Sequence, residues 1–208
     1  IAAMPPFWRD CLTGQHEPDL SAVRVRDDAC YLWRTDSVRS RIGLFGASKV
    51  LRAKPQPIDK NDWPDALRQC PGAVYRVDEQ VIDPCSLVAT LRERHLQHIV
   101  ALDADTPLQA RSVEDNAAQL TLQGRGGESQ QVTASRVVLT AGSGNAALRE
   151  TLGLASPMMQ RRPLHMPMVK GDLPRISGHC ADGAKTRITV TWDVAEDGQT
   201  VWQVGGQV

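Results

Sequence analysis

The sequence has no excess of charge of either sign and no long apolar run. Its 24 basic and 24 acidic residues cancel over 208 positions. This balance argues against a protein that binds nucleic acid or a membrane surface through bulk charge. The longest apolar candidate, residues 137–141, has the length of a strand, whereas a membrane-spanning helix needs about 20 apolar residues. We therefore predict no nucleic-acid partner and no transmembrane segment.

The sequence also has no paired-cysteine motif and no secretory leader. Its five cysteines are scattered and odd in number, and none forms a Cys-x-x-Cys pair, which favours a reduced, cytoplasmic protein. Residues 1–6 carry neither a basic segment nor an apolar core, so no signal peptide is expected. The chain begins with Ile1 and ends with Gly205-Gly206-Gln207-Val208 just after a strand pattern. We interpret it as an internal piece of a longer protein.

Local patterns predict a mixture of strands and short helices. Strict alternation at 187–193 predicts a strand, and Asp197-Gly198 predicts the hairpin turn that leads into 200–204. Asp83 before Pro84 predicts a capped helix with an apolar face that extends to about His98. A second, shorter helix is expected to begin at 61–64. Further extended segments are expected at 29–33, 49–58, 73–82, 99–102, 108–113, 119–123, 131–133 and 164–169.

The most informative segment is 137–145, where a strand pattern runs into a glycine turn and a helix pattern at 146–152. Residues 142–147 match G-x-G-x-x-A, a form of the dinucleotide fingerprint. That fingerprint requires an acidic residue about 20 positions further on. Residues 160–167 contain Arg161 and Arg162 but no acid. Two interpretations remain open: an NADP-binding turn whose arginines take the 2′-phosphate, and a bend that only joins a strand to a helix.

Arg162 and His165 precede an apolar extended segment. A guanidinium suits a carboxylate or phosphate because it donates two parallel hydrogen bonds. These residues are therefore candidates for binding an anionic substrate, and the alternative is a charged strand entrance on the surface.

No metal site and no cysteine nucleophile are expected. His95 and His98 lie three positions apart on one predicted helix, and two ligands do not complete a zinc site. His179 and Cys180 are adjacent, so they would point to opposite faces of an extended segment and could not cooperate.

The order of several segments resembles a known family. Val81-Ile82-Asp83-Pro84 comes before a helix, Thr106-Pro107-Leu108 follows, and residues 137–142 come after it. Together, over about residues 73–208, they resemble the flavin-dependent amine and amino-acid oxidoreductases. This group contains D-amino-acid oxidase, glycine oxidase and the flavin-linked glycerol-3-phosphate dehydrogenases. The resemblance implies an α+β fold, a mixed-sheet substrate domain with part of an interleaved Rossmann-type FAD domain. It implies hydride transfer from a C–N or C–O bond of a small substrate to flavin.

The resemblance also assigns domains and site residues. Residues 1–102 would belong to the substrate domain with one FAD-domain helix at about 83–98. Residues 103–154 would be the middle of the FAD domain, and 155–208 would return to the substrate domain. The implied cofactor-binding residues are Pro107, Leu108, Ala141, Gly142 and Ser143. The implied substrate-binding residues are Arg162 and His165, with Lys49, Arg52, Trp192 and Trp202 as weaker candidates. No catalytic side chain is named, because flavin itself supplies the redox chemistry.

The chain departs from this family at the phosphate-binding motif. The family's G-x-G-x-x-G belongs near the protein N-terminus, and residues 1–100 contain none. We therefore expect this chain by itself to bind FAD weakly or not at all, and to be inactive. Two alternatives stay open: a stand-alone non-catalytic α+β binding domain, and an NADP-binding domain that uses residues 142–147. The sequence carries no prediction of the oligomeric state.

Overall fold

The computed structural model divides the chain into two compact units. Unit 1 combines Ile1–Arg94 with Leu164–Val208, and unit 2 is His95–Pro163. The structure describes residues 4–35, 55–103, 105–106, 108–113, 117–154, 156–160, 165–182 and 185–206. None of the helices within these ranges could cross a membrane.

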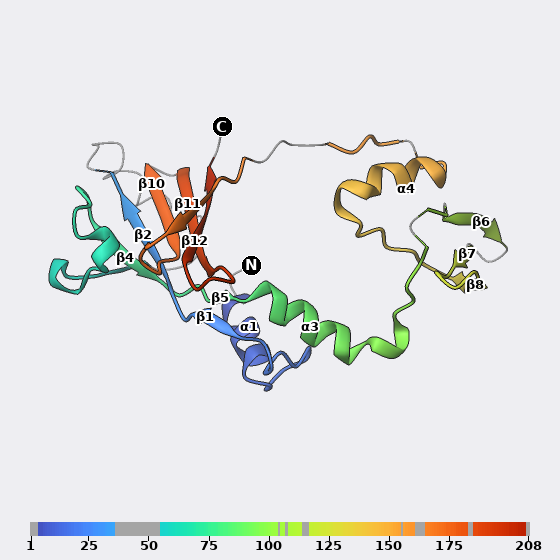
Figure 1. Cartoon of the computed structure of the whole chain (residues 1–208), viewed down its shortest axis with the longest axis horizontal. Helices are drawn as coiled ribbons and strands as arrows, with labels where there is room; N and C mark the ends of the chain where they lie inside the picture. Colours follow the sequence, from blue (N-terminus) through green and yellow to red (C-terminus); the bar gives the residue numbers. More distant parts are fainter. Residues whose placement is uncertain are drawn as a thin grey trace. The chain divides into compact units, whose positions relative to one another are not determined.

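Unit 1 is built on a mixed sheet, as predicted. Within the described residues the sheet has seven strands in the order β3-β4-β2-β10-β11-β12-β9. Strands β2 and β10 pair in parallel, whereas all the other neighbours are antiparallel (Figure 1). The strands are β2 (Cys30–Arg34), β3 (Gln56–Pro57), β4 (Val74–Val77), β9 (Met168–Gly171), β10 (Gly178–Asp182), β11 (Lys185–Val194) and β12 (Thr200–Gly206).

Alternation along the strands gives this sheet two distinct faces. The pairing register puts Trp33, Trp192 and Trp202 on one side, which we term the tryptophan face. Leu32 and His179 are register partners and lie on the other side, which we term the histidine face. Each face carries its own buried cluster: Trp63, Leu67, Val74 and Ile176 on the tryptophan face, and Leu32, Val77 and Ala181 on the histidine face.

The helix expected to begin at 61–64 is a wrong prediction. Two 3-10 turns stand there, η1 (Lys60–Asp62) and η2 (Asp65–Leu67), and neither has a side-chain cap. Trp63 between them is extended, with φ −67° and ψ 139°. This conformation is expected, because the ring of the following Pro64 disfavours the helical region for the residue before it.

The helix expected after Asp83 is confirmed as α3 (Pro84–Arg94). The Asp83 carboxylate accepts the backbone N–H of Cys85 at 2.9 Å, which is the predicted cap. The α-helix ends at Arg94, and a 3-10 turn, η3 (Leu96–His98), extends it to the predicted end.

An N-terminal helix that the sequence did not signal packs beside α3. This helix, α1 (Met4–Leu12), buries Cys11 completely against Leu20 and Val23. Leu87 and Leu91 of α3 contact the same cluster. Two short strands, β1 (Val25–Asp27) and β5 (Val81–Ile82), pair antiparallel. In the sequence β1 lies between α1 and β2, and β5 lies between β4 and α3.

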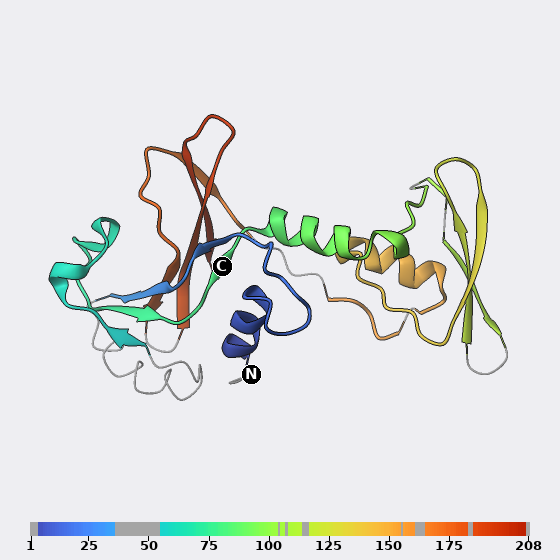
Figure 2. The same ribbon diagram turned by 90° about the horizontal axis from the view of Figure 1, so that it is seen from below.

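Unit 2 contains the predicted antiparallel meander. Strands β6 (Gln109–Val113), β7 (Ala117–Gln123) and β8 (Ser129–Ala134) form a three-stranded sheet (Figure 2). The strand expected at 99–102 is reduced to one bridge, between Leu102 and Gly124.

The helix expected at 146–152 is confirmed as α4 (Asn145–Thr151), and Gly153 ends it as predicted. Gly153 has φ +69°, its N–H donates to Glu150, and the next N–H, of Leu154, donates to Arg149. These two bonds form a Schellman motif, in which the left-handed position favours glycine.

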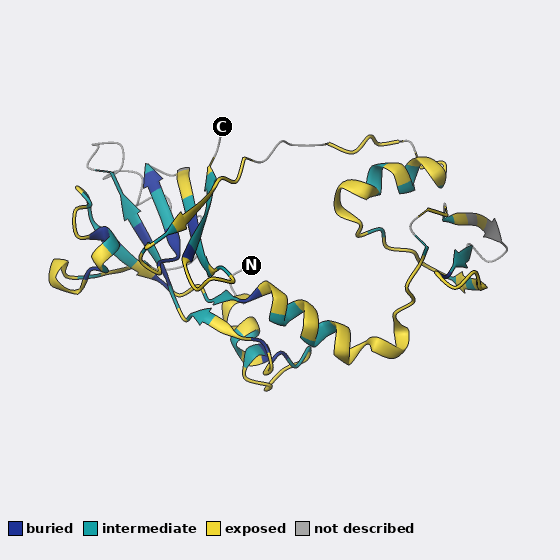
Figure 3. Ribbon diagram, viewed as in Figure 1, coloured by how far each residue is buried: buried dark blue, intermediate teal, exposed yellow. Residues whose placement is uncertain are grey.

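Unit 2 has almost no interior of its own. Among its described residues only Gly124 is buried, and no apolar side chain is (Figure 3). Val138 is 80% exposed and Met158 is 89% exposed. A unit that buries its apolar side chains only in part gains less of the burial free energy that stabilises a domain.

Candidate functional site

The predicted glycine turn is the 3-10 turn η5 (Gly142–Gly144), which continues directly into α4. The Asn145 side chain holds this turn: its Oδ1 accepts the Ala141 N–H at 2.7 Å, and its Nδ2 donates to the Leu139 carbonyl at 3.0 Å. Gly142 has φ +56°, and a Cβ built on it would meet no atom within 4 Å. The backbone conformation therefore favours glycine here. The space beside it is open to a ligand.

The strand expected at 137–141 is a wrong prediction. These residues belong to no strand and pair with none among the described residues, and Ala141, with φ −81° and ψ 19°, is outside the extended region. Val137 is 39% exposed and Val138 is 80% exposed. An apolar segment becomes a stable strand only when a neighbour bonds its backbone and buries its side chains. In the part of the chain that the structure describes, no neighbouring strand bonds to residues 137–141 or covers their side chains.

The turn also differs from a dinucleotide-binding turn in its second glycine. Gly144 has φ −70° in the right-handed helical region, so its conformation does not require glycine. The helix that follows has seven residues. The resemblance of residues 142–147 to G-x-G-x-x-A therefore does not extend to a strand, a tight turn and a long helix.

The other predicted cofactor-binding positions are placed as follows. Ala141 and Ser143 flank Gly142 and are exposed. Leu108 lies directly before β6 and is half-buried, and Pro107 lies outside the described residues. The four described positions belong to unit 2.

The predicted substrate-binding residues are not brought together by the described part of unit 1. His165 is exposed on the segment before β9. Arg162, Lys49 and Arg52 lie outside the described residues.

Trp192 and Trp202 are direct cross-strand partners on β11 and β12. The indole N–H of Trp202 donates to the Pro174 carbonyl at 2.8 Å, and its ring packs against the core of the tryptophan face. The Arg175 guanidinium lies 5.0 Å from the centre of the Trp192 ring. Both tryptophans therefore have structural contacts in unit 1.

Asp27 forms a hydrogen-bonded hub that the sequence did not signal. Its Oδ2 accepts the hydroxyl of Ser177 at 2.6 Å and the indole N–H of Trp192 at 2.7 Å. Ser177 is 1% exposed, so its hydroxyl has no access to water. The hub ties the end of β1 to β11 and to the segment that enters β10.

Next to this hub lies an ionic cluster around one buried carboxylate, that of Asp83. Arg26 contacts Asp83 at 3.3 Å and Asp193 at 2.9 Å, and Arg24 forms a further ion pair with Asp83. Asp83 is 3% exposed. Burial acts to raise the pKa of Asp83, but the N–H groups at the start of α3 and the two arginines outweigh it and lower the pKa. The carboxylate is therefore held in its charged form.

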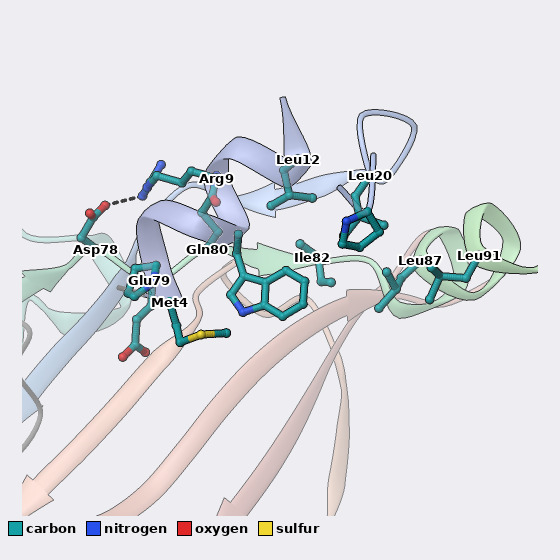
Figure 4. A pocket seen from close by; sticks show the side chains of 13 residues that line it. Met4, Arg9, Leu12, Leu20, Asp78, Glu79, Gln80, Ile82, Leu87 and Leu91 are labelled. Carbon is teal, nitrogen blue, oxygen red and sulfur yellow. Dashed lines mark hydrogen bonds and ion pairs between the residues drawn. The ribbon is translucent and has the colours of Figure 1, made fainter. Parts of the chain in front are cut away.

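A groove of about 550 Å³ lies between α1, β5 and α3 (Figure 4). Its volume falls within the range typical of small-molecule sites. One end is polar, where Arg9 pairs with Asp28 at 3.0 Å and with Asp78. The rest is apolar and includes Met4, Trp8, Leu12, Leu20, Ile82, Leu87 and Leu91. Since α1 was not predicted, the sequence could not indicate this groove.

A second cluster of chemically active side chains lies on the histidine face. The Nε2 atom of His179 is 3.5 Å from the Oε2 atom of Glu79, and Cys30 is the third member. Hydrogen bonding with His179, and to a lesser extent its charge, lowers the pKa of Glu79 against the effect of burial, whereas burial raises the pKa of the Cys30 thiol to about 12. A thiol with so high a pKa is protonated at neutral pH, which argues against a nucleophile. His179 and Cys180 do lie on one strand, β10, as two neighbours that point to opposite faces.

The mixed sheet and the unit inserted between its strands define an α+β protein. Over its whole length the chain is 40% identical to a protein of Pseudomonas aeruginosa strain PAO1 named "Probable FAD-dependent oxidoreductase PA4991", of which it covers 52%. It also matches the crystal structure of the FAD-dependent oxidoreductase PA4991 with 35% identity and a TM-score of 0.69, covering 99% of this chain and 50% of that one. The chain therefore spans about half the length of these relatives and shares the fold of that half. No protein-family model matches the chain.

Proposed function

We propose that this chain forms part of an FAD-dependent oxidoreductase. The observation that carries the proposal is the 40% identity to a protein named as such an enzyme, which extends over the whole chain. The division into units supports it, because unit 2 is inserted between two segments that complete one sheet. Interleaving of this kind is what the resemblance to the D-amino-acid oxidase group implies. Unit 1 would belong mainly to the substrate domain and unit 2 to the FAD domain.

In this proposal the turn at Ala141, Gly142 and Ser143 approaches the ribose–pyrophosphate part of FAD, and the backbone at Pro107 and Leu108 approaches the adenine. The left-handed conformation of Gly142 and the open space beside it fit such an approach. FAD, when bound, supplies the hydride acceptor. The contribution of these residues is to hold the cofactor by backbone contacts and to keep its place free of side chains.

On the substrate side, we propose that Arg162 and His165 bind the anionic group of a small amino acid, hydroxy acid or phosphate ester. The reaction would then be hydride removal from a C–N or C–O bond, with no catalytic side chain assigned. We also propose a cytoplasmic location, because all five cysteines are free thiols.

The cofactor contact can be tested with two glycine variants in the gene product that contains this chain. Gly142 and Gly153 both have a positive φ, and an added Cβ meets no atom within 4 Å at either position. Alanine in the left-handed region costs roughly 1–2 kcal/mol, so Gly142→Ala and Gly153→Ala should lower stability similarly. Only Gly142→Ala should lower the amount of flavin that the purified protein retains, measured by absorbance after release.

Equal flavin retention in both variants would show that Gly142 does not contact the cofactor. A gene product that carries no flavin at all would instead contradict the proposed function and favour a non-catalytic binding domain. The 208-residue chain alone is expected to hold little or no FAD, because it lacks the G-x-G-x-x-G motif.

A further inference from the structure

Three different metal-ligating side chains meet on the histidine face. Cys30 stands at the start of β2, His179 lies on β10, and Glu79 lies just after β4. Their ligand atoms all lie within 4.8 Å of one another. The meeting is produced by the sheet, since β2 is the neighbour of both β4 and β10.

The separation of His179 and Glu79 suits a shared cation better than a direct bond. Their nearest atoms are 3.5 Å apart. A charge-assisted hydrogen bond would bring them to about 2.7–2.9 Å. Around a tetrahedral ion with bonds of about 2.1 Å, nitrogen and oxygen ligands are separated by about 3.4 Å. The observed distance therefore leaves room for an ion between the two groups.

The histidine ring is held by a partner of the kind that orients metal ligands. Its Nδ1 lies 3.0 Å from the hydroxyl oxygen of Thr189, which is the register partner of His179 on β11. When a cation takes the place of the proton on Nε2, the remaining proton on Nδ1 donates to that hydroxyl, and the lone pair of Nε2 is available to the metal. An outer partner on the second nitrogen is the usual support of a ligating histidine.

We propose that Cys30, Glu79 and His179 bind one Zn²⁺ ion or a cation of similar preference, with a fourth position open to water. Sulfur, imidazole nitrogen and carboxylate oxygen are the donors that zinc accepts, whereas Ca²⁺ and Mg²⁺ require oxygen donors throughout. On binding, the Cys30 sulfur forms a bond to the metal and its proton leaves to solvent. The site lies in unit 1 and does not depend on the proposed flavin chemistry.

The test uses Co²⁺ as a spectroscopic substitute for zinc in the gene product that contains this chain. The protein is purified with a reducing agent, freed of metal with a chelator and of any bound flavin, and titrated with Co²⁺. One equivalent should produce a sulfur-to-cobalt charge-transfer band and the visible bands of tetrahedral cobalt. Added Zn²⁺ should then remove both.

Variants assign the signal to the three residues. Cys30→Ser should remove the charge-transfer band, and Glu79→Gln should weaken cobalt binding without removing the sulfur contact. Thr189→Val should weaken binding by about 10–100-fold, as expected for an outer partner. Cys85→Ser and His95→Gln replace an exposed thiol and an exposed imidazole, so they are the matched controls and should bind as the wild type does.

Glu79→Gln keeps the test decisive if Cys30→Ser does not fold, because Glu79 is half-exposed and its replacement leaves the core intact. The proposal is overturned if the wild-type chain gives no charge-transfer band. It is also overturned if the band persists in a folded Cys30→Ser variant or disappears in Cys85→Ser. Unchanged cobalt affinity in Glu79→Gln would likewise exclude the proposed site.

Discussion

Removing the Asp27 carboxylate should destabilise unit 1 strongly. Asp27→Ala takes the acceptor away from two donors at once, the Ser177 hydroxyl and the Trp192 indole N–H. Each buried donor left without a partner costs about 1–3 kcal/mol. Trp192 is only half-buried and can regain water, whereas Ser177 is fully enclosed. We therefore expect a loss of about 2–4 kcal/mol in the free energy of unfolding.

Asp28, the next residue, provides the matched control for Asp27→Ala. Asp28 accepts hydrogen bonds from Arg9 and Gln80, but its side chain is 65% exposed. Its removal leaves groups that water can solvate, so Asp28→Ala should have a much smaller effect than Asp27→Ala. Urea denaturation followed by tryptophan fluorescence measures both, since Trp192 itself belongs to the hub.

A double-mutant cycle tests the hydrogen bond directly. If the bond contributes as described, Asp27→Ala combined with Trp192→Phe should cost less than the sum of the two single changes. The reasoning is refuted if the free energy of unfolding of Asp27→Ala lies within about 0.5 kcal/mol of the wild-type value, which is the range of ordinary surface substitutions. Equal losses for Asp27→Ala and Asp28→Ala would refute it as well.

Two further predictions concern Asp83 and the β11–β12 hairpin. The pKa of Asp83 is lowered by folding, so its stabilising contribution is present above the unfolded value of about 3.9 and is lost as the pH falls through the folded value. Urea unfolding over the acid range should therefore show a shallower loss of stability in Asp83→Asn, and an unchanged pH profile would contradict this. Gly198 has φ +83° in the hairpin turn, so Gly198→Ala should cost roughly 1–2 kcal/mol in thermal or urea unfolding. Gly171→Ala, where φ is not positive and an added Cβ meets nothing within 4 Å, should cost far less, and a similar loss in both would refute the conformational argument.

The features that could be predicted from the sequence are those whose cause lies within a few residues. Asp83 caps α3 because its side chain reaches the N–H of Cys85, two positions away. The hairpin forms around Gly198 because the turn itself requires a positive φ. The C-terminal end of α4 at Gly153 has the same kind of local origin.

Most of the features that were missed or wrong depend on distant parts of the chain, and the interrupted helix at Trp63 is the local exception. Residues 137–141 have a strand composition, but a strand also needs a partner, and composition does not provide one. Trp63 and Pro64 interrupt the expected helix because the local proline effect outweighs the cap signal. Cys30, Glu79 and His179 carry no spacing motif, because only the sheet brings them together. The assignment of the units to FAD and substrate domains, and the roles of Arg162 and Gly142, stay predictions.

The parallel pairing of β2 with β10 has a consequence for how this chain is made. Cys30–Arg34 leaves the ribosome long before its partner Gly178–Asp182 is synthesised, and all of unit 2 is translated in between. Until β10 is synthesised, β2 has only β4 as a partner in this sheet, and the edge of β2 that will pair with β10 is unpaired. Such an edge is a site for incorrect association during synthesis. We therefore expect this edge to need protection during synthesis, by a chaperone or by rapid completion of the C-terminal strands.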